Sequence, residues 1–385
     1  MDDVELKNIE LQFPLIRRMS KCDAYTQEDK ITTDLGTMFV VVQGDRNKPA
    51  IFTYHDIGLN HVTNFQAFLN YADTPILIQS FCIYHINAPG QEEDAITLPT
   101  GYIYPTMDQL AEMLTVVMEY YGLKHFIGFG VGAGANILAR FALQRPDCVD
   151  GLFLINCTSN AASWTEWGYQ KVNAMNLRNS GMTTSTQEYL MWYHFGKLTE
   201  ERNRDLMRLF KYFFNKSVNP YNLALFIDSF IKRTDLQIVR ETEPAKKKIA
   251  RNFRCHVLLL AGNLSPHLEM TITMNSRLDP TNSTWMKLSD CGMPLEEQPA
   301  KVCEALHLFL QGLGYAANQF RRRSSAASTS SDIASLSVLR GENRSRQNSL
   351  QKDYPGSFLS SNYGGRQEVH IVENPINIHN ISGDQ

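Results

Sequence analysis

Little in this sequence supports a disulfide framework, a structural metal site or a membrane anchor. Its seven cysteines are isolated from one another and none forms a C-x-x-C pair, so neither a disulfide scaffold nor a zinc site is expected. No stretch approaches the roughly twenty apolar residues of a membrane-spanning helix, and the acidic start of the chain lacks the apolar core of a secretory signal. These absences predict a soluble cytoplasmic protein with reduced thiols.

An excess of charge of one sign is also missing. The formal net charge is -3, which offers no overall electrostatic attraction to nucleic acid or to an anionic membrane. The 385 residues, of which 43% are hydrophobic, suffice for one large core plus an insertion or a tail. We therefore expect a globular protein with no metal, no cofactor and no nucleic-acid partner.

A serine is missing from the most informative motif of the chain. The run Gly-Val-Gly-Ala-Gly at 130–134 has the spacing of a hydrolase nucleophile elbow, but Gly132 stands where the nucleophilic serine belongs. The apolar run 125–129 precedes it, and apolar residues at helical spacing follow from Ile137 to Ala142, as expected for a turn between a buried strand and a helix. A phosphate-binding loop is disfavoured, since the glycines miss the dinucleotide spacing and no Lys-Ser/Thr pair follows.

Strand and helix patterns alternate along most of the chain. They predict an α/β-hydrolase fold, with a doubly wound, mostly parallel sheet, a helical cap insertion and a disordered C-terminal tail. The predicted parts are an N-terminal segment (1–31), the first part of the core (32–157), the helical cap (158–235), the second part of the core (236–315) and the Ser/Arg-rich tail (316–385).

The other two members of a catalytic triad are missing as well. In this fold the acid follows a late strand and the histidine precedes the last helix, and these places hold Asn263 and Gly292. The loop after the third strand supplies an oxyanion-hole amide and often begins with His-Gly, whereas here His55 is followed by Asp56. With Ala133, these two residues are the candidates for lining a vacated pocket.

A site rebuilt from other residues is the alternative. It requires a nucleophile within about 3 Å of a base. The candidate nucleophiles are Ser159, Ser265, Cys157 and Cys291, and the candidate bases are His55, His194 and His267.

The sequence resembles the N-myc downstream-regulated (NDRG) family. The matching runs are Tyr54–His61, Ala88–Glu92, Gly101–Leu114, Gly132–Ala135, Asn275–Pro280 and Gln311–Tyr315. The resemblance covers roughly residues 30–315 and implies an α/β-hydrolase fold that lacks hydrolase activity. It also implies a cytoplasmic protein of differentiation and stress signalling that acts through protein partners.

The tail carries basic residues before several serines. Arg344 and Arg346 precede Ser349 by five and three residues, and three consecutive arginines precede Ser324 and Ser325. Such spacing suits a basophilic Ser/Thr kinase, and the resemblance likewise implies basic-directed phosphorylation in the tail. A phosphate would add roughly -1.5 to -2 charges to a locally basic segment.

Together these features predict a pseudo-hydrolase rather than an enzyme. The scaffold would bind a protein partner, or a small apolar ligand in the vacated pocket, and the phosphorylated tail would regulate it. A hydrolase with an unconventional catalytic constellation is the alternative function.

Overall fold

The computed structural model describes residues 26–71, 74–196, 203–247 and 249–315. The predicted tail, with Ser324, Ser325 and Ser349, lies outside these residues. Within them, one eight-stranded sheet runs through the molecule in the order β1-β2-β4-β3-β5-β6-β7-β8. The strands are β1 (Thr26–Thr33), β2 (Gly36–Gln43), β3 (Ala50–Tyr54), β4 (Cys82–Asn87), β5 (Phe126–Val131), β6 (Val149–Ile155), β7 (His256–Gly262) and β8 (Ser283–Leu288).

The sheet is mostly parallel, as predicted. Only the pairs β1–β2 and β2–β4 are antiparallel, and the strands from β4 across to β8 pair in parallel. Strands β3, β4 and β5 are buried along their whole length, because helices cover a parallel sheet on both faces, and such strands therefore appear in the sequence as continuous apolar runs. The α/β-hydrolase fold is thus confirmed.

Strand β1 was not predicted. It is an edge strand that begins at Thr26, inside the segment that the sequence left unassigned, and Ile31 is its one buried residue. An edge strand with a single buried side chain has no alternating apolar pattern, so nothing in its sequence distinguishes it from a loop.

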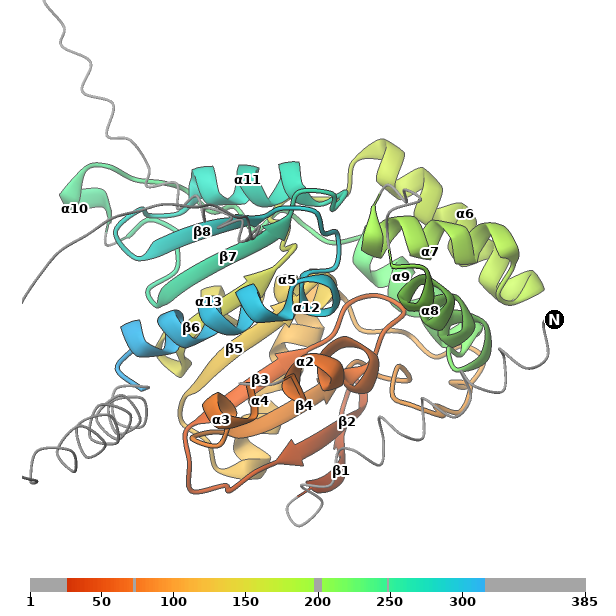
Figure 1. The fold of residues 1–385 in the computed structure, drawn as a ribbon, viewed down its shortest axis with the longest axis horizontal. Coiled ribbons are helices and arrows are strands. Elements are labelled where there is room, and N and C mark those ends of the chain that lie inside the picture. The colour runs from red at the N-terminus through yellow and green to blue at the C-terminus, as the bar shows by residue number, and fades with distance from the viewer. Residues whose placement is uncertain (1–25, 72–73, 197–202, 248, 316–385) are drawn as a thin grey trace, which may run out of the picture. The chain divides into compact units, whose positions relative to one another are not determined.

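Helices of the core lie on both sides of the sheet (Figure 1). They are η2 (Val62–Gln66), α2 (Ala67–Leu69), α3 (Thr74–Ile78), α4 (Met107–Tyr121), α5 (Gly132–Gln144), η3 (Pro146–Cys148), α10 (Pro244–Lys247), α11 (Leu268–Arg277), α12 (Pro294–Glu297) and α13 (Pro299–Gly312). Helix α4 begins at the predicted capping box, in which the Thr106 hydroxyl accepts from the Gln109 amide and the Gln109 side chain accepts from the Thr106 amide.

Four further helices form the predicted helical insertion between β6 and β7. They are α6 (Trp164–Ser180), α7 (Thr184–Phe195), α8 (Arg204–Lys216) and α9 (Pro220–Ile231), and Figure 1 shows them grouped together at one end of the sheet. Each is preceded by an N-cap residue whose side chain accepts a hydrogen bond from a backbone amide of the first turn. The four N-cap residues are Ser163, Thr183, Asn203 and Asn219.

Candidate functional site

The turn from β5 into α5 has the backbone geometry of a nucleophile elbow. Gly132 has φ +51°, in the left-handed region that the elbow requires. The flanking glycines are required by close packing: a Cβ on Gly134 would lie 2.2 Å from the Tyr54 carbonyl oxygen, and one on Gly130 would lie 2.6 Å from the Ala135 Cα. The short motif therefore fixes how α5 packs on the sheet, whatever residue stands at its centre.

The Asp56 carboxylate binds the amides that flank the elbow. Its Oδ1 atom accepts from the Ala133 amide at 2.9 Å and from the Ile57 amide at 2.7 Å. In an active hydrolase, the amide after the nucleophile and one from the loop after β3 form the oxyanion hole. Here a side chain of the protein itself occupies both donors. Tyr193 of α7 adds a third hydrogen bond, from its hydroxyl to the same oxygen at 3.2 Å.

The same carboxylate also fills the space of the missing nucleophile. A Cβ built on Gly132 would lie 2.1 Å from the Asp56 Cγ and Oδ2 atoms and 2.2 Å from Oδ1. Real Cβ atoms do not approach other atoms so closely, so a serine at 132 and an aspartate at 56 exclude each other in this conformation. Asp56 is buried, and burial raises its pKa to about 6, while the two amides act in the opposite direction.

Asn263 lies directly after β7, at the place expected for the acid. Its amide donates to the Leu288 carbonyl at 2.8 Å, and its side-chain Oδ1 accepts from the Cys291 amide at 3.4 Å. The residue therefore joins the ends of β7 and β8. A neutral amide in this place cannot stabilise an imidazolium as a carboxylate does.

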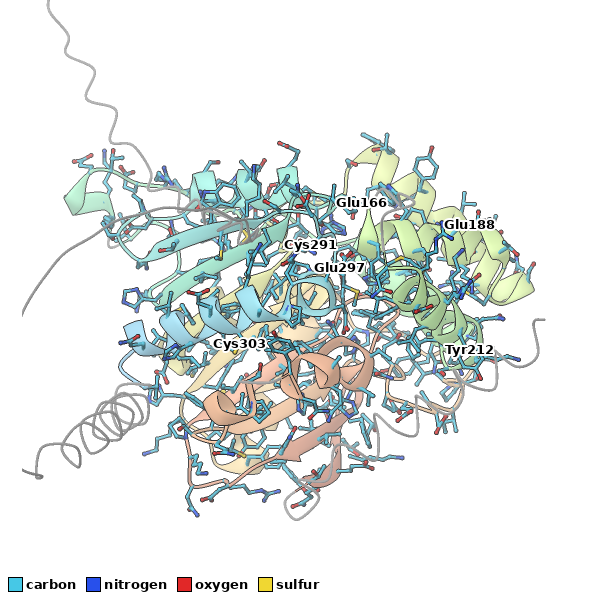
Figure 2. The ribbon with its side chains drawn as sticks, viewed as in Figure 1. Glu166, Glu188, Tyr212, Cys291, Glu297 and Cys303 are labelled. Carbon is cyan, nitrogen blue, oxygen red and sulfur yellow. The ribbon has the colours of Figure 1, made fainter. Side chains whose placement is uncertain are left out.

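Gly292 lies before α12, at the place expected for the histidine. Its amide donates to the Glu297 carboxylate at 2.8 Å and its carbonyl accepts from Asn156 at 3.1 Å. Glu297, the last residue of α12, is labelled in Figure 2. A Cβ on Gly292 would lie 2.2 Å from the Phe195 carbonyl oxygen of α7, so the helical insertion fills the space that a histidine side chain would need.

The three candidate bases are buried, and each contacts a hydrogen-bonding group of the backbone. His55 donates from Nδ1 to the Asp56 carbonyl at 2.8 Å and accepts at Nε2 from the Ala88 amide at 3.0 Å. His194 donates from Nε2 to the Ile57 carbonyl at 2.9 Å. The third, His267, packs its ring against that of Tyr193.

Burial keeps these imidazoles neutral. It lowers the pKa of His55 and of His267 to about 4 and that of His194 to about 3. The 3.8 Å contact between His194 Nδ1 and Asp56 Oδ2 is therefore not an ion pair near neutral pH.

The candidate nucleophiles are held by other groups. The Ser159 hydroxyl donates to Asn160, the Ser265 hydroxyl accepts from the His267 backbone amide, and the Cys157 thiol contacts the Thr158 carbonyl. Burial raises the pKa of Cys157 to about 12. Among the described residues, none of these hydrogen bonds joins Ser159, Ser265 or Cys157 to an imidazole nitrogen.

The fourth candidate, Cys291, is buried and lies beside Gly262 at the end of β7. Its thiol contacts the Leu288 carbonyl at 3.8 Å. Sequence reasoning missed one hydroxyl–imidazole pair, Thr53 Oγ1 and His85 Nδ1, which lie 2.7 Å apart on neighbouring strands β3 and β4. The two residues are 32 positions apart in the sequence, so the pair is found only from the register between β3 and β4.

The space left beside Asp56 is small. A cavity of about 10 Å³ is bounded there by Asn64, Tyr193, His194 and Met293, among other residues, which is room for about one water molecule. A small apolar ligand would enter only if these side chains moved. In the described part of the chain no cluster of His, Cys, Asp or Glu residues is suited to a metal ion, and no helix there is long and apolar enough to cross a membrane.

Comparison with known proteins shows the family to which this chain is similar and the fold that it shares with solved structures. The family model described as "Ndr family" matches residues 28–317. Protein NDRG3 of Xenopus laevis is 40% identical over 337 residues, which cover 86% of this chain and 88% of that protein. Protein NDRG1 of Xenopus tropicalis is 42% identical over 315 residues, which cover 80% of this chain and 77% of that protein.

The solved structures that resemble this chain are α/β-hydrolases of low sequence identity. A thermophilic esterase from Thermogutta terrifontis has a TM-score of 0.60 at 19% identity and covers 74% of this chain and 99% of its own. An enol-lactonase from Burkholderia xenovorans has a TM-score of 0.59 at 14% identity and covers 74% of this chain and 100% of its own. At such identities the likeness shows the fold alone.

Gly132→Ser will destabilise the protein by roughly 2–4 kcal/mol, because the new side chain collides with the Asp56 carboxylate. Asp56→Ala opens that space, so the double variant Asp56→Ala/Gly132→Ser will be more stable than the sum of the two single effects predicts, by about 1 kcal/mol or more. Urea unfolding of the four proteins measures this coupling. Gly168→Ser is the control, since a Cβ there meets nothing within 4 Å. If the unfolding free energies of Asp56→Ala and Gly132→Ser are purely additive in the double variant, the proposed collision is contradicted.

The stability difference between wild type and Asp56→Asn will depend on pH. The folded pKa of Asp56, about 6, lies above the ordinary value of 3.8, so folding takes up a proton between these values. The stability of the wild type relative to Asp56→Asn is therefore greatest below pH 3.8 and falls as the pH rises through about 6. Urea titrations from pH 4 to pH 7 check this, and a difference that is flat across the range would count against the burial effect.

Proposed function

This chain belongs to the Ndr family, and on that premise we propose that it is a non-catalytic α/β-hydrolase-fold protein that acts in signalling through protein partners. The roles in differentiation and stress response and the cytoplasmic location belong to the same proposal. One observation carries it: the Asp56 carboxylate accepts the hydrogen bonds of Ala133 and Ile57 that an acyl-transfer enzyme keeps for its substrate.

Acyl transfer needs a nucleophile, a base and free oxyanion donors together. The loss of a single oxyanion donor costs a hydrolase a factor of about 10²–10³ in kcat. In this chain both donors are taken and Gly132 brings no nucleophile. The backbone holds both ring nitrogens of His55. Each of these features supports a scaffold that no longer turns over esters.

The surface of the helical insertion supports a binding role. Helix α6 exposes Trp164, which is 89% accessible, and further along it exposes Val172 and Met175. At 3.6 residues per turn, Trp164, Val172 and Met175 lie on one side of the helix. Exposed aromatic and methionine side chains that gather in one row are typical of protein interfaces.

The absence of hydrolysis is tested with purified protein and a panel of short-chain acyl esters. A serine-directed fluorophosphonate and a thiol-directed iodoacetamide probe are used in parallel, and an active esterase of the same fold is the positive control. We expect no saturable turnover and no stoichiometric labelling. Saturable hydrolysis that disappears on labelling would replace the proposal with a hydrolase of unconventional constellation.

Regulation by the tail is part of the proposed function. Ser349, with Arg344 and Arg346 before it, is the preferred site for a basophilic kinase, and Ser324 and Ser325 are further sites. Phosphopeptide mapping of the protein from stimulated native cells is expected to find phosphate on Ser349, and Ser349→Ala is expected to remove that signal. A fully unmodified Ser349 under stimulation would refute regulation by phosphorylation at this serine.

A further inference from the structure

A second, larger hollow lies away from the elbow. Its volume is about 700 Å³, and it opens where β1 and β2 meet η2, the loop at 92–96 and helix α8. We call it the β1–α8 groove. Residues that define it are Glu28, Phe39, His61, Glu92, Asp94 and Phe213. The cavity at Asp56 is lined by none of these residues, so the groove is a separate candidate site.

The floor of the groove is one face of the antiparallel part of the sheet. Alternate residues of a strand point to the same face, and Glu28 and Lys30 of β1 both line the groove. Their cross-strand partners on β2, Val41 and Phe39, line it as well. Polar and apolar side chains thus lie side by side on the floor.

Several of the residues that line the groove carry aromatic rings. Phe39 lies 6.4 Å from the His61 ring, measured between centroids, and His61 lies 5.6 Å from His85. Helix α8 contributes Phe210 and Phe213. Burial lowers the pKa of His61 to about 4 and that of His85 well below its usual value, so neither imidazole contributes positive charge near neutral pH.

The charge of the groove is negative. Among its described lining residues, five carboxyl groups stand against one cation, Lys30. The carboxyl residues are Glu28, Glu92, Glu93, Asp94 and Glu296. Burial raises the pKa of Glu296 to about 8, so the negative charge at neutral pH comes mainly from the others. This concentration of charge is local, since the whole chain carries a formal net charge of only -3.

One carboxylate oxygen of Glu92, a residue that lines the groove, lacks a partner among the described residues. Glu92 Oε2 is buried and has no hydrogen-bond partner in the part of the chain that the structure describes. A buried carboxylate oxygen without a partner is costly, and a cation in the groove would offset that cost once side-chain movement exposes the oxygen. The groove therefore combines acidic and aromatic side chains, and one of its carboxylates has a buried oxygen without a donor among the described residues.

We propose that the β1–α8 groove binds an extended, cationic segment of a protein partner. Lysine and arginine fit this chemistry, because their aliphatic stems pack on aromatic rings while their charged heads reach carboxylates. A volume of about 700 Å³ holds several residues rather than one side chain, which favours a peptide over a small organic cation. The proposal deepens the proposed binding role, on which it rests for the class of partner.

Fluorescence anisotropy of the full chain tests the groove. The probe is a labelled nonapeptide of lysine, leucine and serine, and its matched control carries glutamate in place of every lysine. We expect saturable binding of the lysine peptide, weakened by added salt, and little binding of the glutamate peptide. The double variant Glu92→Gln/Asp94→Asn is expected to weaken binding about fivefold, the effect of two ion pairs with one half-buried and one exposed carboxylate.

The variant Glu112→Gln/Glu119→Gln is the control, since it removes the same charge from two exposed positions of α4 outside the groove. Unchanged affinity in that protein supports the groove. Equal weakening in both double variants, equal binding of the glutamate peptide, or displacement of the lysine peptide by tetramethylammonium at equal concentration would each overturn the proposal. Ester hydrolysis is measured separately, so a chain that binds the peptide and also hydrolyses esters would keep the groove and lose the non-catalytic role.

Discussion

The arrangement around the elbow depends on one buried carboxylate. Asp56 accepts hydrogen bonds from two backbone amides and one tyrosine hydroxyl, and it lies where a nucleophile's side chain would be. Helix α5 has no side-chain cap of its own at Val131, so Asp56 supplies the acceptor that its first turn lacks. The residue that fills the catalytic space is therefore also the N-terminal acceptor of a core helix.

The backbone shape of the elbow therefore does not depend on a nucleophile at its centre. Gly130 and Gly134 are required because neighbouring backbone lies within 3 Å of any Cβ there, and that requirement holds whether or not a serine stands between them. The strand–turn–helix unit can thus form with Gly132 at its centre. Similarity of fold to esterases accordingly carries little weight for activity, and the groups at the site must decide it.

Much of the fold could be predicted from the sequence because buried parallel strands and capped helices have local patterns. The elbow spacing, the capping box at Thr106 and the helical insertion were readable in this way. The contact between Asp56 and Tyr193 joins residues 137 positions apart, and no periodicity connects them. Asp56 was named only as a residue that could line a pocket. Its position against Gly132 depends on how the loop after β3 packs on the elbow, which a local pattern does not encode.

The end of α7 has a consequence for solvent exchange. Within three residues it supplies the Tyr193 hydroxyl to Asp56, the His194 ring to the Ile57 carbonyl, and the Phe195 backbone that borders Gly292. Lifting this helix would break two buried hydrogen bonds together, so we expect the Ala133 amide, which donates to Asp56, to exchange slowly with deuterium. The exchange rate of that amide proton therefore reports how often the packed region around Asp56 opens to solvent.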